Sequence, residues 1–263
     1  MSTTPNLPNP PKRFGVATWV SFVLAGLFVW AVLGIEVEGD RLAGVPGKLA
    51  DLAGLMWPPD AEYGQESVLP AILESIQIAW LGTMIGAALS LPFGLLGAKN
   101  LFPWLGTGVT VILAAIRAFP EILLAIYFVP IVGLGAFAGT LAVGFHSIGM
   151  LGKLSSDVVE SMDTGPVEAL TACGGSKIQT LRWAVIPQVL PEFVALWLYR
   201  FEINIRASAV LGVVGAGGIG GVLLQTLRYR RFDKAGAVIV LTVLVVLAID
   251  ALSSRIRHRL IHG

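Results

Sequence analysis

Six long apolar runs alternate with polar stretches along this 263-residue chain. An apolar run of about 20 residues is long enough to cross the hydrocarbon core of a bilayer as a helix. The pattern therefore predicts six transmembrane helices, at residues 16–35, 71–96, 104–132, 137–158, 187–214 and 235–252. Pro120 interrupts the third run and predicts a kink there, because proline removes a backbone hydrogen bond and clashes one turn back.

A proline-rich segment, 1–15, precedes the first run, and we predict that it forms a disordered cytoplasmic tail. The run at 16–35 is longer than the apolar part of a secretory signal, and no small-residue cleavage site follows it. It therefore predicts an uncleaved membrane anchor. Residues 36–70 would form an external loop, in which the leucines between 49 and 55 recur at helical spacing. This spacing predicts a short interfacial helix lying on the membrane surface.

Lysine and arginine residues in short loops favour the cytoplasmic side of a membrane. An even number of spans puts both chain ends on that side, including the basic tail at 253–263. The same side would hold four further basic residues, Lys99, Lys153, Lys177 and Arg182. The acidic stretch at 36–66 falls on the opposite, external side. One basic group also falls outside, against this rule: Arg228, Arg230, Arg231 and Lys234.

The composition supports a membrane protein and excludes several classes of function. Charged residues make up 13% of the chain, against about 25% in soluble domains. The net charge of +1 gives no reason to expect a nucleic-acid partner. Cys173 is the single cysteine, so it can form neither an internal disulfide nor a metal cluster with other cysteines. The sequence contains no Walker-type phosphate loop, and we predict no catalytic residue, metal site or bound cofactor in this chain.

A polar segment between the fourth and fifth runs predicts a helix–turn–helix on the cytoplasmic side. The stretch from Glu168 to Cys173 is compatible with a helix, and Gly174 can close it because glycine adopts a positive backbone angle. Ser176 can then cap a second helix that begins at Lys177. An ordinary amphipathic loop is the alternative interpretation.

The spacing within this segment resembles the EAA motif of ABC importer permeases. Three residues separate Glu168, Ala169 and Leu170 from Gly174, and twelve more separate Gly174 from Pro187. Leucine at 170 departs mildly from the family pattern, which has alanine there. In that family the segment is a coupling helix that docks onto a separate ATP-hydrolysing subunit. The resemblance implies the same coupling role for these five residues.

The resemblance also implies an all-α polytopic membrane protein with the type I ABC importer permease fold. The permease core would span 71–252 and would include a coupling loop at 160–186. Such a chain would act as a homodimer in a bacterial inner membrane, with both termini cytoplasmic. Its partners would be two ATP-binding subunits on the cytoplasmic side and an extracytoplasmic substrate-binding protein. ATP and Mg²⁺ would bind to the ATPase partner, so this chain would not be an enzyme.

Three further stretches resemble the phosphonate-type permeases of this family: MWPPD, ILESIQIAWLGTMIGAALSLPFGLLGAKN and LYRFEINIRASAVLGVVGAGGIG. Together with the stretch from Arg117 to Pro120, they imply import of a phosphonate, phosphite or phosphate ester. A methionine-like or other small solute is the alternative within the family. A secondary transporter that uses Glu121, His146 and Asp250 for proton transfer is a rival from another class, although it gives the EAA-like spacing no purpose.

Four polar residues lie inside the fifth apolar run, where a charge costs about 2.5–3.5 kcal/mol: Arg200, Glu202, Asn204 and Arg206. Glu202 and Arg206 are four residues apart, which predicts an ion pair along the helix. Buried pairs of this kind could simply fix helix packing. Alternatively, Arg117, Arg200 or Arg206 could line the path of an oxyanion, since the guanidinium fork matches its oxygens.

A glycine run follows the fifth apolar run: Gly215, Gly217, Gly218 and Gly220. Its spacing fits a dinucleotide-binding fingerprint, but Asp233 comes too soon after it and in a basic segment. We expect a close helix contact or a non-helical turn lining a cavity instead. The family resemblance implies a position at the external end of the pathway, near the dimer axis. For His146 we expect a packed, hydrogen-bonded side chain, and for Asp250 a position near Arg255 and the membrane interface.

Overall fold

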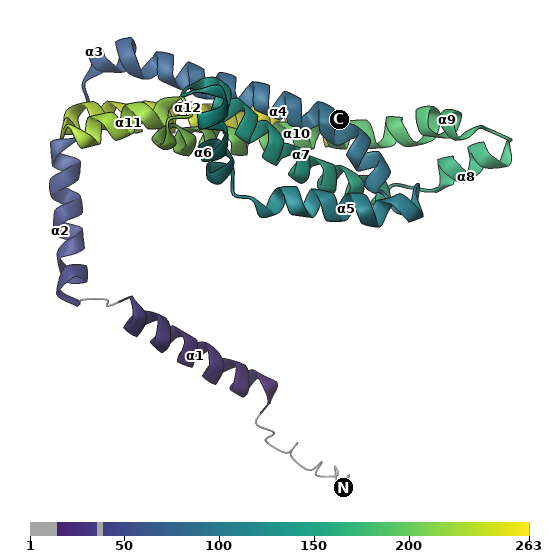
Figure 1. Ribbon diagram of the computed structural model, residues 1–263, viewed down its shortest axis with the longest axis horizontal. Coiled ribbons are helices and arrows are strands. Elements are labelled where there is room, and N and C mark those ends of the chain that lie inside the picture. Colours follow the sequence, from purple (N-terminus) through teal and green to yellow (C-terminus); the bar gives the residue numbers. More distant parts are fainter. Residues whose placement is uncertain (1–14, 36–38, 263) are drawn as a thin grey trace, which may run out of the picture. The chain divides into compact units, whose positions relative to one another are not determined.

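The computed structural model of the chain describes residues 15–35 and 39–262, and all regular secondary structure within these ranges is helical (Figure 1). The chain divides into two compact units, one ending at Gly54 and the other beginning at Leu55.

The N-terminal unit contains the predicted anchor as helix α1 (Val16–Gly34). Its side chains are apolar on all faces, which is typical of a helix that spans a membrane. Helix α2 (Gly39–Leu55) follows and includes the stretch in which the leucine spacing predicted an interfacial helix, although it begins earlier than that spacing indicated. The predicted disordered tail lies outside the described residues up to position 14.

The C-terminal unit is a bundle of long helices with short helices at its ends. The chain enters it through α3 (Ala61–Tyr63) and a π-helical turn (Gly64–Val68). The first half of the bundle consists of α4 (Leu69–Gly97), α5 (Pro103–Ala118), α6 (Glu121–Val132) and α7 (Ala136–Ser161). The second half consists of α8 (Gly165–Ala172), α9 (Lys177–Thr180), a π-helical turn (Leu181–Val185), α10 (Ile186–Leu211), a 3₁₀ turn (Gly212–Val214), α11 (Ile219–Arg228) and α12 (Phe232–His262).

Three continuous helical stretches of the described chain are long and apolar enough to cross a membrane: Ala61–Gly97, Lys177–Val214 and Phe232–Arg259. Helices α5 and α6 pass the same test only as a pair, bent by 80° at a short break. The break falls at Pro120, where the sequence predicts a kink. The other two predicted spans coincide with α1 and α7, neither of which passes this test: the apolar part of α1, Thr18–Gly34, is shorter, and α7 contains many glycine and serine residues.

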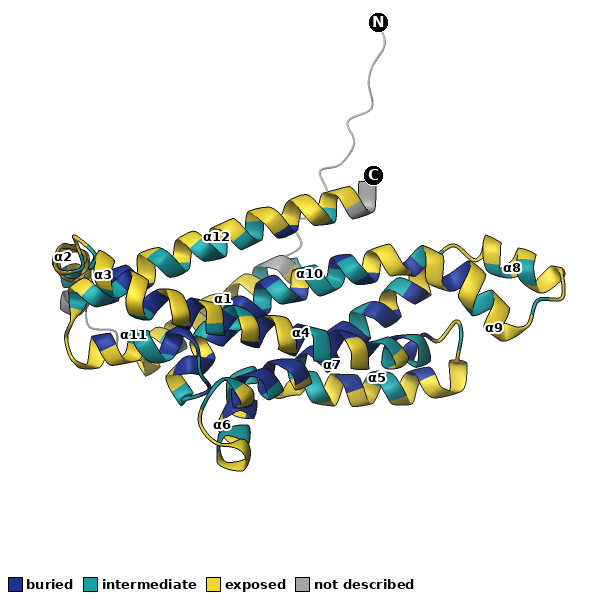
Figure 2. Cartoon of the chain, turned by 90° about the horizontal axis from the view of Figure 1, so that it is seen from above, coloured by how far each residue is buried: buried dark blue, intermediate teal, exposed yellow. Residues whose placement is uncertain are grey.

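Small residues bring α4 and α7 close together along the bundle. A Cβ atom added at Gly86 would lie 2.4 Å from Cβ of Ser147, and one added at Gly94 would lie 2.6 Å from Cβ of Ser155. Such contacts leave no room for a larger side chain and are typical of helix packing in membranes. Figure 2 shows that the buried residues are concentrated on α4, α7 and α10.

The short helices mark two opposite ends of the C-terminal unit. Helices α8 and α9 lie at one end, whereas α3, α11 and the start of α12 lie at the other (Figures 1 and 2). Lys234 of α12 fixes this second end, because its Nζ lies 3.9 Å from Asp60 Oδ2 and 4.5 Å from the centre of the Tyr63 ring. Helix α12 continues through the basic residues after 252, so the predicted C-terminal tail is helical as far as His262.

Candidate functional site

A buried group of charged side chains joins α10, α6 and α7 at the centre of the C-terminal unit. The side chain of Arg200 is only 2% exposed and forms an ion pair with Glu121, the first residue of α6. Arg200 Nη2, the atom that pairs with Glu121, also lies 2.8 Å from His146 Nδ1. His146 Nδ1 in turn lies 2.7 Å from Glu121 Oε1. Arg200 Nε donates to Ser147 Oγ at 3.0 Å. The expectation of a packed, hydrogen-bonded His146 is confirmed.

Asn204 extends this network one helical turn further along α10. Its Nδ2 donates to Thr83 Oγ1 of α4 at 2.8 Å and to Ser147 Oγ of α7 at 3.1 Å. The residue is fully buried, and its Oδ1 has no hydrogen-bond partner within the described part of the chain. Because Arg200 and Asn204 share Ser147, the polar face of α10 is held against three other helices.

The predicted ion pair between Glu202 and Arg206 is wrong. Glu202 Oε2 instead pairs with Arg257 Nη1 at 2.9 Å, and Arg206 Nη2 pairs with Asp250 Oδ2 at 2.7 Å. Both new partners lie on α12, which packs beside α10 and continues past the apolar run. The cross-helix partners were not visible in the local spacing. Asp250 accordingly pairs with Arg206, whereas its predicted neighbour was Arg255.

Arg117 differs from the other two arginines considered for an oxyanion pathway. It lies in the last turn of α5, immediately before the break at Pro120, and packs against α7 near Gly149. Within residues 15–35 and 39–262, no carboxylate forms an ion pair with it, and its buried Nε has no hydrogen-bond partner. Arg200 and Arg206 are neutralised by carboxylates, so Arg117 retains a charge that an anion could meet.

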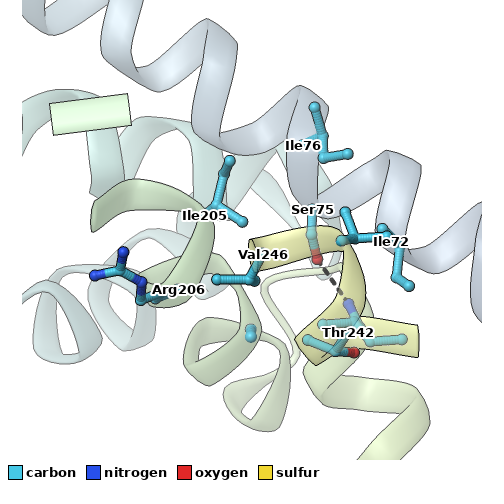
Figure 3. A pocket seen from close by; sticks show the side chains of 10 residues that line it. Ile72, Ser75, Ile76, Ile205, Arg206, Thr242 and Val246 are labelled. Carbon is cyan, nitrogen blue, oxygen red and sulfur yellow. Dashed lines mark hydrogen bonds between the residues drawn. The ribbon is translucent and has the colours of Figure 1, made fainter. Parts of the chain in front are cut away.

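Arg206 lies beside an apolar pocket of about 170 Å³ between α4, α10, α11 and α12. Its guanidinium extends away from Ile72 and Ser75, whereas the other labelled side chains are mostly aliphatic (Figure 3). The pocket therefore offers an oxyanion few hydrogen-bond donors. The polar contact drawn there is structural, because Ser75 Oγ accepts from the backbone N–H of Ile219 at 2.9 Å.

The predicted helix–turn–helix is present as α8, a glycine turn and α9. Gly174 has a φ of 78°, as a glycine that ends a helix requires. Ser176 and Gln179 then form a reciprocal capping box: Ser176 Oγ accepts from Gln179 N, and Gln179 Oε1 accepts from Ser176 N at 2.7 Å. Pro187 occupies the first turn of α10, which follows α9 through the π-helical turn. The alternative of an ordinary loop is therefore wrong.

The residues of the EAA-like segment lie largely on the surface. Glu168 and Ala169 are exposed and Leu170 is half-buried, while Thr164 Oγ1 donates to Glu168 Oε1 at 3.1 Å. Two large apolar side chains nearby are also exposed, Ile178 by 79% and Trp183 by 66%. The sequence analysis predicted a helix beginning at Lys177 but assigned no role to Ile178, although an apolar residue on a short polar helix is a signal for a partner surface. Exposed apolar groups of this kind suit a protein partner.

The glycine run forms a compact turn between α10 and α11. Gly217 and Gly218 both have a φ of 80°, a conformation that favours glycine. A Cβ atom at Gly220 would lie only 1.8 Å from the carbonyl oxygen of Ala209, so α11 folds tightly against α10. Gly215 accepts a backbone hydrogen bond from Gly135 at 2.9 Å. The run lies between two helices, which excludes the strand–turn–helix of a dinucleotide site and agrees with the expected turn.

Across the described ranges, no group of three or more His, Cys, Asp or Glu side chains is placed to hold a metal ion. The contacts around Arg200 are direct ion pairs and hydrogen bonds between side chains.

Comparison with known proteins relates this arrangement to transport. The profile of the family described as binding-protein-dependent transport system inner membrane component matches residues 90–262. The chain is 38% identical to the phosphite transport system permease protein PtxC of Stutzerimonas stutzeri, over 94% of its own length and 92% of that protein. It is 42% identical to the phosphate-import permease protein PhnE of Mycolicibacterium smegmatis over 98% of its length, but it spans about half (49%) of that relative.

A solved structure shares the fold of the bundle. The inward-facing MetNI methionine ABC transporter contains a chain that matches with a TM-score of 0.65 and 22% identity. The match covers 73% of this chain and 95% of the other. At this identity the likeness shows the fold alone, and it confirms the helical permease architecture predicted from the sequence.

Proposed function

We propose that this chain, which belongs to the family of binding-protein-dependent transport system inner membrane components, is the membrane-spanning subunit of an ATP-driven importer for a phosphorus oxyanion. Phosphite, phosphonates and phosphate make up this substrate class. Identities of 38% and 42% to permeases named for phosphite and phosphate import support it. Arginine side chains in the bundle supply a chemistry that suits such a substrate.

As a family member the chain is a multi-pass protein of the inner membrane, and it works with an ATPase and a binding protein. Permeases of this family are not themselves catalytic. We infer that two copies form a homodimer, with two ATP-binding subunits on the cytoplasmic side and the binding protein on the other. Both termini would then be cytoplasmic, as the distribution of lysine and arginine predicts.

The observation that carries the transport mechanism is the helix–turn–helix formed by α8 and α9. It presents Glu168, Ala169 and Ile178 on the surface at one end of the bundle. Helix α9 passes without a loop into α10, which holds the buried network around Arg200. A displacement of the coupling segment by an ATPase partner would therefore move α10 directly. This continuity explains how ATP hydrolysis in a partner could change access to the centre of the bundle.

Arg117 is the residue that we assign to the substrate pathway. Its charge is not neutralised by any described carboxylate, and it lies next to the break between α5 and α6. A passing oxyanion would satisfy the buried Nε, which otherwise has no partner. Arg200, Glu202, Asn204 and Arg206 serve mainly to fix helix packing, since each already forms an ion pair or hydrogen bonds with other helices.

Co-purification and uptake test the proposal together. The chain is expressed with a candidate ATPase and binding protein, and uptake of radioactive phosphite or phosphate into proteoliposomes is measured. We expect Glu168→Ala and Gly174→Asp to abolish uptake and to weaken ATPase binding. Glu192→Ala, which removes an exposed carboxylate of α10 outside the coupling segment, serves as the matched control. Normal ATPase binding and uptake in both coupling variants would show that the segment does not couple the subunits.

A further inference from the structure

A polar pocket opens at the end of the bundle opposite α8 and α9. It has a volume of about 460 Å³, and its walls come from the start of the unit and from the end of α11. Its lining residues are Tyr63, Ser67, Gln225, Thr226, Tyr229 and Arg231. A second pocket, of about 330 Å³, shares Gln225 and Tyr229 with the first and adds Arg228. The two pockets are neighbours through these shared residues, and we call them together the basic recess.

The basic turn that borders the recess has a defined backbone. Arg231 N donates to Thr226 O at 2.9 Å, and Arg230 N donates to Leu227 O at 3.1 Å, which together close the end of α11 as a Schellman motif. Arg230 stands at the position of this motif where glycine is favoured, with a φ of 55°. The turn therefore holds the cationic side chain of Arg230 at a position where the backbone conformation favours glycine.

Three arginine charges of this turn are not compensated. Within the described part of the chain, Arg228, Arg230 and Arg231 form no ion pair and no side-chain hydrogen bond. Lys234 is different, because it lies 3.9 Å from Asp60 and stacks on the Tyr63 ring. Arg231 lines the main pocket and Arg228 the second one, whereas Arg230 lines neither, and the one carboxylate of the same segment is Asp233. Two uncompensated guanidinium groups at the recess therefore favour an anion there.

We propose that the basic recess binds a free phosphorus oxyanion at the external end of the permease, as an anion site separate from the pathway at Arg117. This inference rests on the proposed function, which supplies the substrate class. Arg231 offers a guanidinium fork to two oxygens of the anion, while Ser67 and Gln225 offer further donors from two sides of the recess. The glycine turn directly precedes α11, which contributes Gln225 and Thr226 to the recess.

Two other occupants explain the charges less well. A phospholipid would bring its acyl chains next to its headgroup, but across the two pockets of the recess a single aliphatic side chain, Leu224, is among the lining residues. An acidic surface of a binding protein could pair with arginines on a flat face, but it would leave a recess of this volume unfilled. A small free anion can reach both Arg231 and the polar groups beside it.

Protection of a single thiol tests the site directly. Cys173 is the one cysteine of the sequence, so Cys173→Ser combined with Ser67→Cys places a unique thiol in the recess. The rate at which a neutral maleimide modifies the full chain in a neutral detergent is measured with and without phosphite or inorganic phosphate, at constant ionic strength. We expect the anion to slow the reaction about twofold at a concentration equal to its dissociation constant, because half of the sites are then occupied.

Variants of two arginines identify the binding group. We expect Arg231→Gln to abolish protection by phosphite and Arg255→Gln to leave it unchanged, since Arg255 is an exposed cation far along α12. If the thiol at position 67 prevents folding, Gln225→Cys gives a second reporter in the same recess. The inference would be overturned if neither phosphite nor phosphate protected the thiol, or if protection survived Arg231→Gln.

Two additional arms separate the sources of the effect. Protection by phosphatidylglycerol alone would assign the recess to a lipid, and protection by the substrate-free binding protein alone would assign it to protein docking. Either result would overturn the inference. The assay measures binding without transport, so anion protection in a chain that shows no ATP-dependent uptake would sink the proposed function and keep the site. ATP-dependent uptake without protection of the thiol would support the proposed function and overturn the anion site.

Discussion

Arg200 and Glu121 form a buried ion pair although they are 79 positions apart in the sequence. The exposed fractions of their side chains are 2% and 17%. His146 contacts both residues, so α10, α6 and α7 meet at one cluster of charges. Because Glu121 directly follows the break between α5 and α6, the pair fixes the bent segment against the helix that continues from the coupling segment.

Removing the carboxylate of this pair should destabilise the bundle strongly. We expect Glu121→Gln to lower the free energy of unfolding by about 3–5 kcal/mol, because it leaves the charge of Arg200 buried and unpaired. Unfolding in detergent, followed by heating or by denaturant, measures the change. Asp157→Asn is the control, since it breaks a half-exposed pair with Lys153 that should contribute about 1 kcal/mol or less. Equal losses in the two variants would contradict a special role for the buried pair.

Replacing Arg117 should affect the substrate more than the fold. An ionic hydrogen bond contributes about 1.5–3 kcal/mol, so we expect Arg117→Gln to raise the KM of uptake by about tenfold or more. Arg117→Lys keeps the positive charge but loses the guanidinium fork, so its KM should lie between those of the wild type and Arg117→Gln. The competing role is structural, because a cation in the last turn of α5 also interacts favourably with the helix dipole. A lower melting temperature with an unchanged KM would favour that role.

Patterns local to the sequence were sufficient for much of the fold. The apolar runs predicted the long helices to within a few residues at most ends, and Pro120 predicted the break of 80°. The cap at Ser176 and the turn at Gly174 were also predictable, since both depend on residues next to each other. In these cases the backbone conformation follows from one or two side chains, whatever the rest of the chain does.

Contacts between distant helices could not be predicted in the same way. The spacing of Glu202 and Arg206 allows an ion pair, but in the packed bundle α12 supplies a different partner to each of them, Arg257 at 2.9 Å and Asp250 at 2.7 Å. Helix α11 was missed because its ten residues follow a glycine run and contain no long apolar stretch. The choice of Glu121 as the partner of Arg200 depends on how α6 bends, which no local pattern determines.

The exposed apolar residue of α9 should contribute to ATPase binding. Ile178 is 79% exposed beside the capping box, and burial of such a side chain at an interface contributes more than about 1 kcal/mol where it fills a partner pocket. We therefore expect Ile178→Ala to weaken ATPase binding by about fivefold or more. Lys177→Ala changes the neighbouring exposed residue and should have little effect. Titration of the purified ATPase against the permease in nanodiscs measures both, and equal affinities for wild type and Ile178→Ala would contradict docking through α9.

Two adjacent glycines should respond oppositely to the same substitution. A Cβ atom at Gly220 would lie 1.8 Å from the carbonyl oxygen of Ala209, so Gly220→Ala must force α11 away from α10. A Cβ atom at Gly221 would meet its nearest neighbour, the carbonyl oxygen of Gly212, at an ordinary 3.5 Å. Alanine is favoured over glycine in a helix by about 1 kcal/mol, so Gly221→Ala should leave the melting temperature unchanged or raise it. We expect Gly220→Ala to lower the melting temperature clearly and to abolish uptake. A stable, active Gly220→Ala variant would show that the turn before α11 is looser than its backbone contacts indicate.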